Sequence, residues 1–207
     1  DRFEGIREDA EFLWNETDYA VIGCPAFNGV WERAWYLCGF ERMLRSLVLE
    51  PEFVHAVLQR VTAIGKAVME RYLDLAGPFI QMIKMGDDLG GQGGPLMSPK
   101  TYRTVVKPYH QELFEVIRRH TEARIFLHTC GSVYRLLPDL IDAGVEVLNP
   151  VQVSAVDMDT RRLKAEFGDR LSFMGAIDTQ RVLPFRTPDE VRREVERRIA
   201  DLAPGGG

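Results

Sequence analysis

The stretch that decides the fold reads Arg124-Ile125-Phe126-Leu127-His128-Thr129-Cys130-Gly131. Its first five residues form a short apolar run, which predicts a buried β-strand. Side chains two apart on a strand point the same way, so we expect His128 and Cys130 to face one side together. An imidazole and a thiolate are ligands that Zn²⁺ prefers. The alternative interpretation is a buried thiol close to a core histidine.

The composition suits one globular domain with a sizeable core, because 45% of the 207 residues are hydrophobic and 28% are charged. A net charge of −5 argues against nucleic acid or an anionic membrane as the main partner. We expect no membrane span and no signal peptide. The cysteines Cys24, Cys38 and Cys130 form no disulfide framework, which favours the reducing cytoplasm.

Both ends of the chain lack features of a complete protein. The sequence begins without Met inside an expected helix, and it stops at Pro204-Gly205-Gly206-Gly207, where a further strand is expected. We therefore expect residues 1–207 to be a single domain that is truncated at both ends.

Strand and helix patterns alternate along the chain. Strands are expected at 19–22, 79–85, 124–128, 145–149 and 171–174. Helices are expected at 3–16, 31–38, 41–47, 53–76, 98–120 with a kink at Pro108, 132–143, 159–167 and from 187 onward. Alternation with short connections predicts a parallel sheet.

Periodicity alone does not separate an open doubly wound sheet from a barrel. The open sheet predicts a phosphate loop after the first strand, but the sequence holds no GxGxxG or GxxxxGK motif. A polar pair instead follows each strand: Cys24 and Asn28, Asp87 and Asp88, His128 and Cys130, Asn149 and Gln152, Asp178 and Gln180. Such a ring is typical of a barrel active site. We predict a (β/α)₈ TIM barrel of the α/β class, incomplete here, with about five βα units visible.

A resemblance to a known family extends over nearly the whole chain. The segments that carry it are Gly86-Asp87-Asp88-Leu89-Gly90, His128-Thr129-Cys130-Gly131-Ser132, Leu148-Asn149-Pro150-Val151-Gln152 and Gly175-Ala176-Ile177-Asp178-Thr179-Gln180. Together they resemble the uroporphyrinogen decarboxylase superfamily. The resemblance implies a (β/α)₈ barrel, and homodimers are common in this superfamily.

The superfamily has two chemically distinct branches. One decarboxylates uroporphyrinogen III without a cofactor and holds the carboxylates of the tetrapyrrole in a deep cleft. The other contains zinc-dependent methyltransferases, which move methyl groups between a corrinoid protein and a thiol such as coenzyme M. Their zinc ligands are a His-x-Cys pair on one strand and a more distant cysteine. By position, His128 and Cys130 match the first two ligands.

This chain resembles the methyltransferase branch more closely. The arginine segment that clamps substrate carboxylates in the decarboxylases is not visible in it, and the His-x-Cys pair is not typical of them. The resemblance therefore implies Zn²⁺ at His128 and Cys130 and a small-molecule acceptor. The sequence has no DxHxxG motif, so a corrinoid would arrive on a separate protein. The third ligand is expected beyond Gly207, with Cys24 as the alternative.

Two other functions stay open at this point. Tetrapyrrole decarboxylation predicts arginines around the barrel mouth and activity in the presence of a chelator. A non-catalytic binding barrel predicts an apolar mouth, with Asp87 and Asp88 facing solvent.

The remaining polar residues at the strand ends receive predicted roles. Asp87 and Asp88 are predicted to be catalytic, as a proton donor, a substrate acceptor or a partner that orients His128, and the alternative is plain loop or cap residues. Asn149, Gln152, Asp178 and Gln180 are predicted to bind substrate. The histidines His55, His110 and His120 are expected on helices, at the surface or partly buried and without a role.

Overall fold

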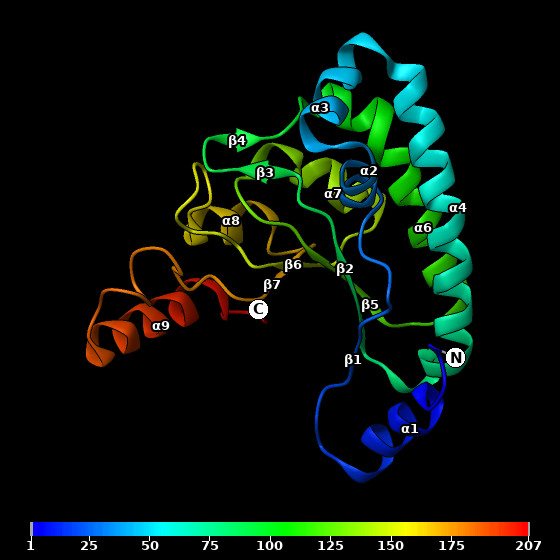
Figure 1. The fold of residues 1–207 in the computed structure, drawn as a ribbon. Helices are drawn as coiled ribbons and strands as arrows, with labels where there is room; N and C mark the ends of the chain where they lie inside the picture. Colours follow the sequence, from blue (N-terminus) through cyan, green and yellow to red (C-terminus); the bar gives the residue numbers. More distant parts are fainter. Residues whose placement is uncertain (1, 207) are drawn as a thin grey trace.

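A five-stranded parallel sheet forms the centre of the computed structural model, which describes residues 2–206. The strands are β1 (Ile22–Gly23), β2 (Met82–Gly86), β5 (Arg124–His128), β6 (Val147–Asn149) and β7 (Ser172–Phe173), and they lie side by side in that order. The sheet forms an open arc with the helices along its outside (Figure 1). The predicted parallel α/β sheet is confirmed, and within residues 2–206 the strands do not close into a barrel.

The helices follow the predicted order. They are α1 (Ile6–Glu16), α2 (Val30–Cys38), α3 (Phe40–Leu49), α4 (Pro51–Ala76), α5 (Pro99–Thr101), α6 (Lys107–His120), α7 (Leu137–Ala143), α8 (Thr160–Phe167) and α9 (Pro188–Leu202). Helices α4 and α6 pack against each other along one side of the arc (Figure 1). Within residues 2–206, no helix is long and apolar enough to cross a membrane.

Several predicted boundaries were wrong for identifiable reasons. The expected helix 98–120 is divided by a π-helical turn at Tyr102–Val106. Pro108 lies just after this turn and has no N–H to donate to the fourth residue before it, which explains the interruption. The first strand begins at Ile22 rather than residue 19. The glycine-rich loop after β2 contains a small hairpin that was not predicted, β3 (Gly90–Gly91) with β4 (Gly94–Pro95).

The two faces of the sheet have different surroundings. The outer face of the sheet packs against the helices. A Cβ built on Gly23 of β1 would point to this face, because it would lie 3.1 Å from the Tyr72 hydroxyl of α4. It would also lie 3.2 Å from the side chain of Ile83, which therefore points to the same face. Ile83 is fully buried on that face. The alternate residues of the strands therefore point to the inner face, among them His128 and its register partners on β2 and β6, Gly86 and Asn149.

Candidate metal site at the strand ends

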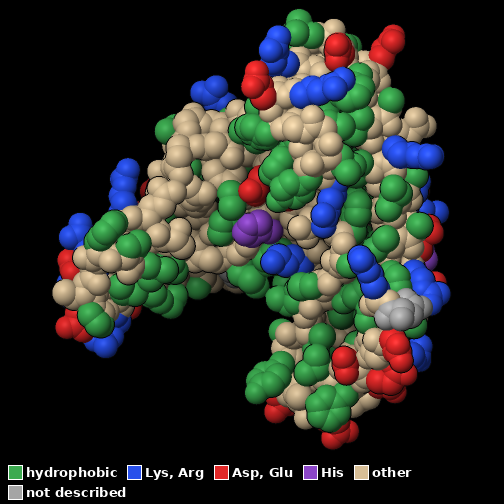
Figure 2. All heavy atoms as spheres, viewed as in Figure 1, with side chains coloured by type: hydrophobic (Ala, Val, Ile, Leu, Met, Phe, Trp, Pro, Cys, Tyr) green, Lys and Arg blue, Asp and Glu red, His purple; other side chains and the backbone are tan. Residues whose placement is uncertain are grey.

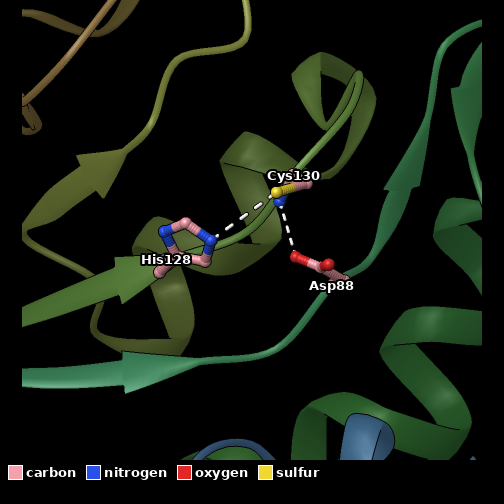
Figure 3. Close-up of side chains that lie close together, drawn as sticks. All are labelled: Asp88, His128 and Cys130. Carbon is pink, nitrogen blue, oxygen red and sulfur yellow. Dashed lines mark hydrogen bonds between the residues drawn. The ribbon is translucent and has the colours of Figure 1, made fainter. Parts of the chain in front are cut away.

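Three potential metal ligands meet where β2 and β5 end. One donor atom from each of Asp88, His128 and Cys130 lies within 4.8 Å of the other two. The His128 Nε2 and Cys130 Sγ atoms are 3.5 Å apart, and the Cys130 backbone N–H donates to Asp88 Oδ1 over 2.7 Å. Figure 3 shows the three side chains turned toward one another from the ends of two neighbouring strands. We call these three residues the donor cluster.

Asn149 sets the orientation and the tautomer of His128. The Asn149 Nδ2 donates to the Met174 carbonyl over 3.0 Å, so its Oδ1 is the atom that faces His128 Nδ1, 2.6 Å away. Because this oxygen only accepts, Nδ1 must carry a proton. The neutral ring then presents the Nε2 lone pair to the donor cluster, as a metal-binding histidine does.

A tight turn brings Cys130 back beside His128. Gly131 has a φ of +80°, and a Cβ there would lie 2.3 Å from the Gly90 carbonyl carbon. Only glycine fits both the conformation and the space. The Gly131 N–H donates to Gln152 Oε1 over 2.8 Å. Gln152 therefore holds the turn in place, and its predicted role in substrate binding stays a prediction.

Burial raises the pKa of the Cys130 thiol to about 11, and the charge of Asp88, a hydrogen bond to it and the charge of Glu32 add to this effect. The thiol is therefore protonated at neutral pH in the metal-free protein. Glu32, in the first turn of α2, was missed by the sequence analysis. Its own pKa is raised, first by burial and then by Asp87 and Asp88.

The donor cluster fits a zinc ion. A tetrahedral site with Zn–N of about 2.0 Å and Zn–S of about 2.3 Å would separate these two ligand atoms by about 3.5 Å. The observed separation of His128 Nε2 and Cys130 Sγ is 3.5 Å. Among residues 2–206, the third donor is Asp88. Cys24, the sequence alternative for that role, is exposed and is not part of the cluster.

Asp87 points away from the donor cluster. Its carboxylate is 0% exposed and accepts the Trp31 and Glu32 backbone N–H groups over 2.9 and 2.6 Å. These N–H groups belong to the first turn of α2, so Asp87 acts as its cap from a distant strand. A Cβ on Gly29 would lie 2.1 Å from Asp87 Cγ, which shows how closely the helix start approaches it. The geometry matches the alternative prediction of a cap residue.

The prediction for His110 was wrong. His110 is 1% exposed, and its Nε2 lies 2.7 Å from Asp87 Oδ2. Its Nδ1 lies 2.9 Å from the Tyr102 hydroxyl, which is also fully buried. The reason is the position of His110 on the inner side of α6, where the Asp87 carboxylate compensates its burial. His55 is half-buried and His120 is exposed, as expected for their helices.

Asp178 and Gln180 are not brought to the donor cluster. The Asp178 Oδ1 atom accepts the backbone N–H groups of Gln180 and Arg181, each over 2.8 Å, and so it stabilises its own turn. Gln180 is exposed.

Figure 2 shows a hollow on one face of the molecule that holds a histidine with an acidic and a basic side chain beside it.

The comparison with known families identifies the chain's relatives. The family model for uroporphyrinogen decarboxylase (URO-D) matches residues 5–207. The chain belongs to the uroporphyrinogen decarboxylase family. This confirms the resemblance seen in the sequence.

Individual relatives of this family member come from both branches. The methylated-thiol–coenzyme M methyltransferase of Methanosarcina mazei is 26% identical over 174 residues, 81% of this chain and 42% of the relative. The methylcobamide:CoM methyltransferase of Methanosarcina barkeri is 30% identical over 135 residues, 61% of this chain and 38% of the relative. The uroporphyrinogen decarboxylase of Alkalilimnicola ehrlichii is 23% identical over 218 residues, 100% of this chain and 55% of the relative.

A solved structure supports the fold. The structure of a methyltransferase from Methanosarcina mazei superposes with a TM-score of 0.73 at 19% identity, and covers 95% of this chain and 55% of its own. The predicted fold of the TIM-barrel superfamily is thus confirmed. The chain spans between 38% and 55% of the lengths of the relatives named here.

Proposed function

We propose that the protein is a zinc-dependent methyltransferase of the cytoplasm, which moves a methyl group between a corrinoid and a thiol or similar acceptor. The corrinoid would arrive on a separate protein. The observation that carries this proposal is the 3.5 Å separation of His128 Nε2 and Cys130 Sγ at the end of β5, a strand of the parallel sheet. Two of the named relatives are methyltransferases, and the name of one of them gives methylcobamide as its substrate. Both relatives support a methyltransferase activity for this protein.

His128, Cys130 and Asp88 are the residues that would hold the metal. When bound, zinc lowers the pKa of a coordinated thiol and presents it as a thiolate nucleophile. The chain's own contribution is orientation, because Asn149 keeps the Nδ1 proton on His128 and leaves Nε2 free to bind. Asp88 holds the turn through the Cys130 N–H and brings a carboxylate to the cluster. This carboxylate can receive the proton of an incoming thiol.

Metal analysis of the full-length protein tests the proposal. We expect stoichiometric zinc in the wild type, and its loss in His128→Ala. His120→Ala is the matched control, because His120 lies at the end of α6 and bonds to the Val116 carbonyl. Wild-type protein without zinc, or His128→Ala protein that retains it, would contradict the proposal. Transfer of methyl from methylcobalamin to a small thiol then tests the reaction.

The second candidate is cofactor-independent decarboxylation of a tetrapyrrole. It is favoured by the match of the Alkalilimnicola ehrlichii decarboxylase over 100% of this chain. It predicts turnover of uroporphyrinogen that persists with a chelator present. A non-catalytic barrel gains no support, since it predicts that both acids face solvent, whereas Asp87 is 0% exposed.

A further inference from the structure

A cavity of about 690 Å³ lies at the edge of the sheet where the strands begin. It is lined by residues of α1, of the segment before β2, of the end of α6 and of the start of β5. Figure 1 shows α1 beside the start of β1, whereas α2 lies beyond the end of this strand. The donor cluster follows β2 and β5, so the cavity lies at the opposite edge of the sheet. Its volume suits a small-molecule ligand.

The charged groups around this cavity are mostly cations. Three arginines line it, Arg118, Arg119 and Arg124, together with one acid, Glu122. Arg124 is paired with Glu146 over 2.5 Å. Within residues 2–206, Arg118 and Arg119 have no carboxylate partner. On a chain with a net charge of −5, the cavity is therefore a local site for an anion.

Contacts with backbone carbonyls hold these two arginines in place. An Arg118 Nη atom donates to the Gly144 carbonyl over 3.1 Å, and Arg119 Nε donates to the Glu115 carbonyl over 3.4 Å. A guanidinium has five N–H donors, so both side chains keep donors for a ligand. Cations in the last turn of a helix also offset its dipole, which accounts for their presence at the end of α6.

Two further groups of the cavity are not explained by the helix end. Gln81 Oε1 accepts the Val21 N–H over 2.6 Å, so the amide nitrogen of Gln81 is left to donate. Trp14 of α1 also lines the cavity and is 43% exposed. A flat indole beside fixed hydrogen-bond donors is suited to a ligand that carries both a ring and an anionic group.

We propose that this cavity binds a nucleoside phosphate or a ligand of the same chemistry, a flat ring joined to a phosphate group. The ring stacks on the Trp14 indole, and the phosphate oxygens accept from Arg118, Arg119 and Gln81. Because the cavity and the donor cluster lie at opposite edges of the sheet, this inference is independent of the proposed function.

Calorimetric titration of the metal-free full-length protein tests the site with three probes. ADP carries both parts of the ligand, adenosine carries the ring alone, and pyrophosphate carries the phosphates alone. We expect ADP to bind with a Kd below about 1 mM, and adenosine and pyrophosphate to bind at least about tenfold more weakly. No saturable binding of ADP, or pyrophosphate binding as tight as that of ADP, would overturn the inference.

Two variants test the two halves of the site. We expect Arg119→Gln to weaken ADP binding about tenfold, through the loss of charge-assisted hydrogen bonds. Arg193→Gln is the matched control, because Arg193 is exposed on α9 and does not line the cavity. Trp14→Leu should weaken ADP binding about tenfold and leave pyrophosphate affinity unchanged.

Both substitutions are at exposed positions, and circular dichroism checks that each variant folds. Trp14→Tyr, which keeps an aromatic ring, replaces Trp14→Leu if the leucine variant does not fold, and should retain most of the ADP affinity. Equal losses of affinity in Arg119→Gln and Arg193→Gln, or ADP binding that is unaffected by Arg119→Gln, would overturn the inference.

Discussion

Asp87 and Asp88 are consecutive residues at the end of β2, yet their carboxylates lie on opposite sides of the strand end. Asp87 is 0% exposed and binds the first turn of α2 and His110. Asp88 is half-buried at the barrel mouth beside His128 and Cys130. The alternation of side chains along a strand is sufficient to separate them. Of the two acids that follow β2, Asp87 therefore has a structural role and Asp88 is a candidate functional residue.

The difference in burial sets what each carboxylate contributes. The Asp87 carboxylate is enclosed and has every contact inside the protein, so its removal leaves buried N–H groups without partners. The Asp88 carboxylate retains access to the mouth, where it can bind an ion or a proton. Stability should therefore depend on Asp87 and metal binding on Asp88.

The largest effect is expected for Asp87→Ala. We predict that it lowers the free energy of unfolding of the full-length protein by about 3–5 kcal/mol, because it breaks a buried pair with His110 and uncaps α2. Urea denaturation measures this. A loss below about 1 kcal/mol would show that the buried contacts of Asp87 do not stabilise the fold.

Asp88→Ala should show the opposite pattern. We expect zinc affinity to fall about 10- to 100-fold, while the free energy of unfolding without metal changes by less than about 1 kcal/mol. Competition with a chelator measures the affinity, and the same urea titration is the control. Unchanged zinc affinity would remove Asp88 from the metal site.

Asn149→Leu tests the orientation of the cluster without removing a ligand. The variant loses the acceptor that holds the Nδ1 proton of His128, so we expect zinc affinity to fall about tenfold. Gln180→Leu is the control, since Gln180 is exposed and lies outside the donor cluster. Equal affinities in both variants would count against the tautomer argument.

The smallest effect concerns the pKa of Cys130. Burial raises this pKa to about 11, and the charge of Asp88 contributes to the increase. Removing that negative charge favours the thiolate, so Asp88→Asn should lower the pKa and move the pH profile of iodoacetamide alkylation to lower pH. Asp87→Asn should leave the profile in place. A shift of equal size in both variants would contradict the separation of the two acids.

Local patterns predicted the central part of the fold correctly. The strand 124–128 was predicted with its true limits, because its apolar run is bounded by charged and polar residues. The proximity of His128 and Cys130 followed from their spacing on an extended segment and the turn at Gly131. The strands β1 and β7 are shorter than predicted, and within residues 2–206 each of them pairs with one neighbouring strand.

The rest of the site depends on contacts between distant segments. The direction of Asp87 is set by the close approach of Gly29, 58 positions before it in the chain. The burial of His110 depends on the approach of α6 to the end of β2, where the His110 Nε2 lies 2.7 Å from Asp87 Oδ2. Neither contact leaves a local pattern in the sequence. The alternation of side chains along β2 was the one feature of the sequence that could have indicated these directions, because it places Asp87 and Asp88 on opposite sides of the strand end.

The most direct test of the account is the absorption spectrum of the full-length protein loaded with cobalt(II) in place of zinc. We predict a thiolate-to-cobalt charge-transfer band that weakens or disappears in Cys130→Ser and persists in Cys24→Ser and Cys38→Ser, since Cys130 alone of these three lies in the donor cluster. A band that is unaffected by Cys130→Ser, or a wild-type protein that shows no such band, would contradict the account.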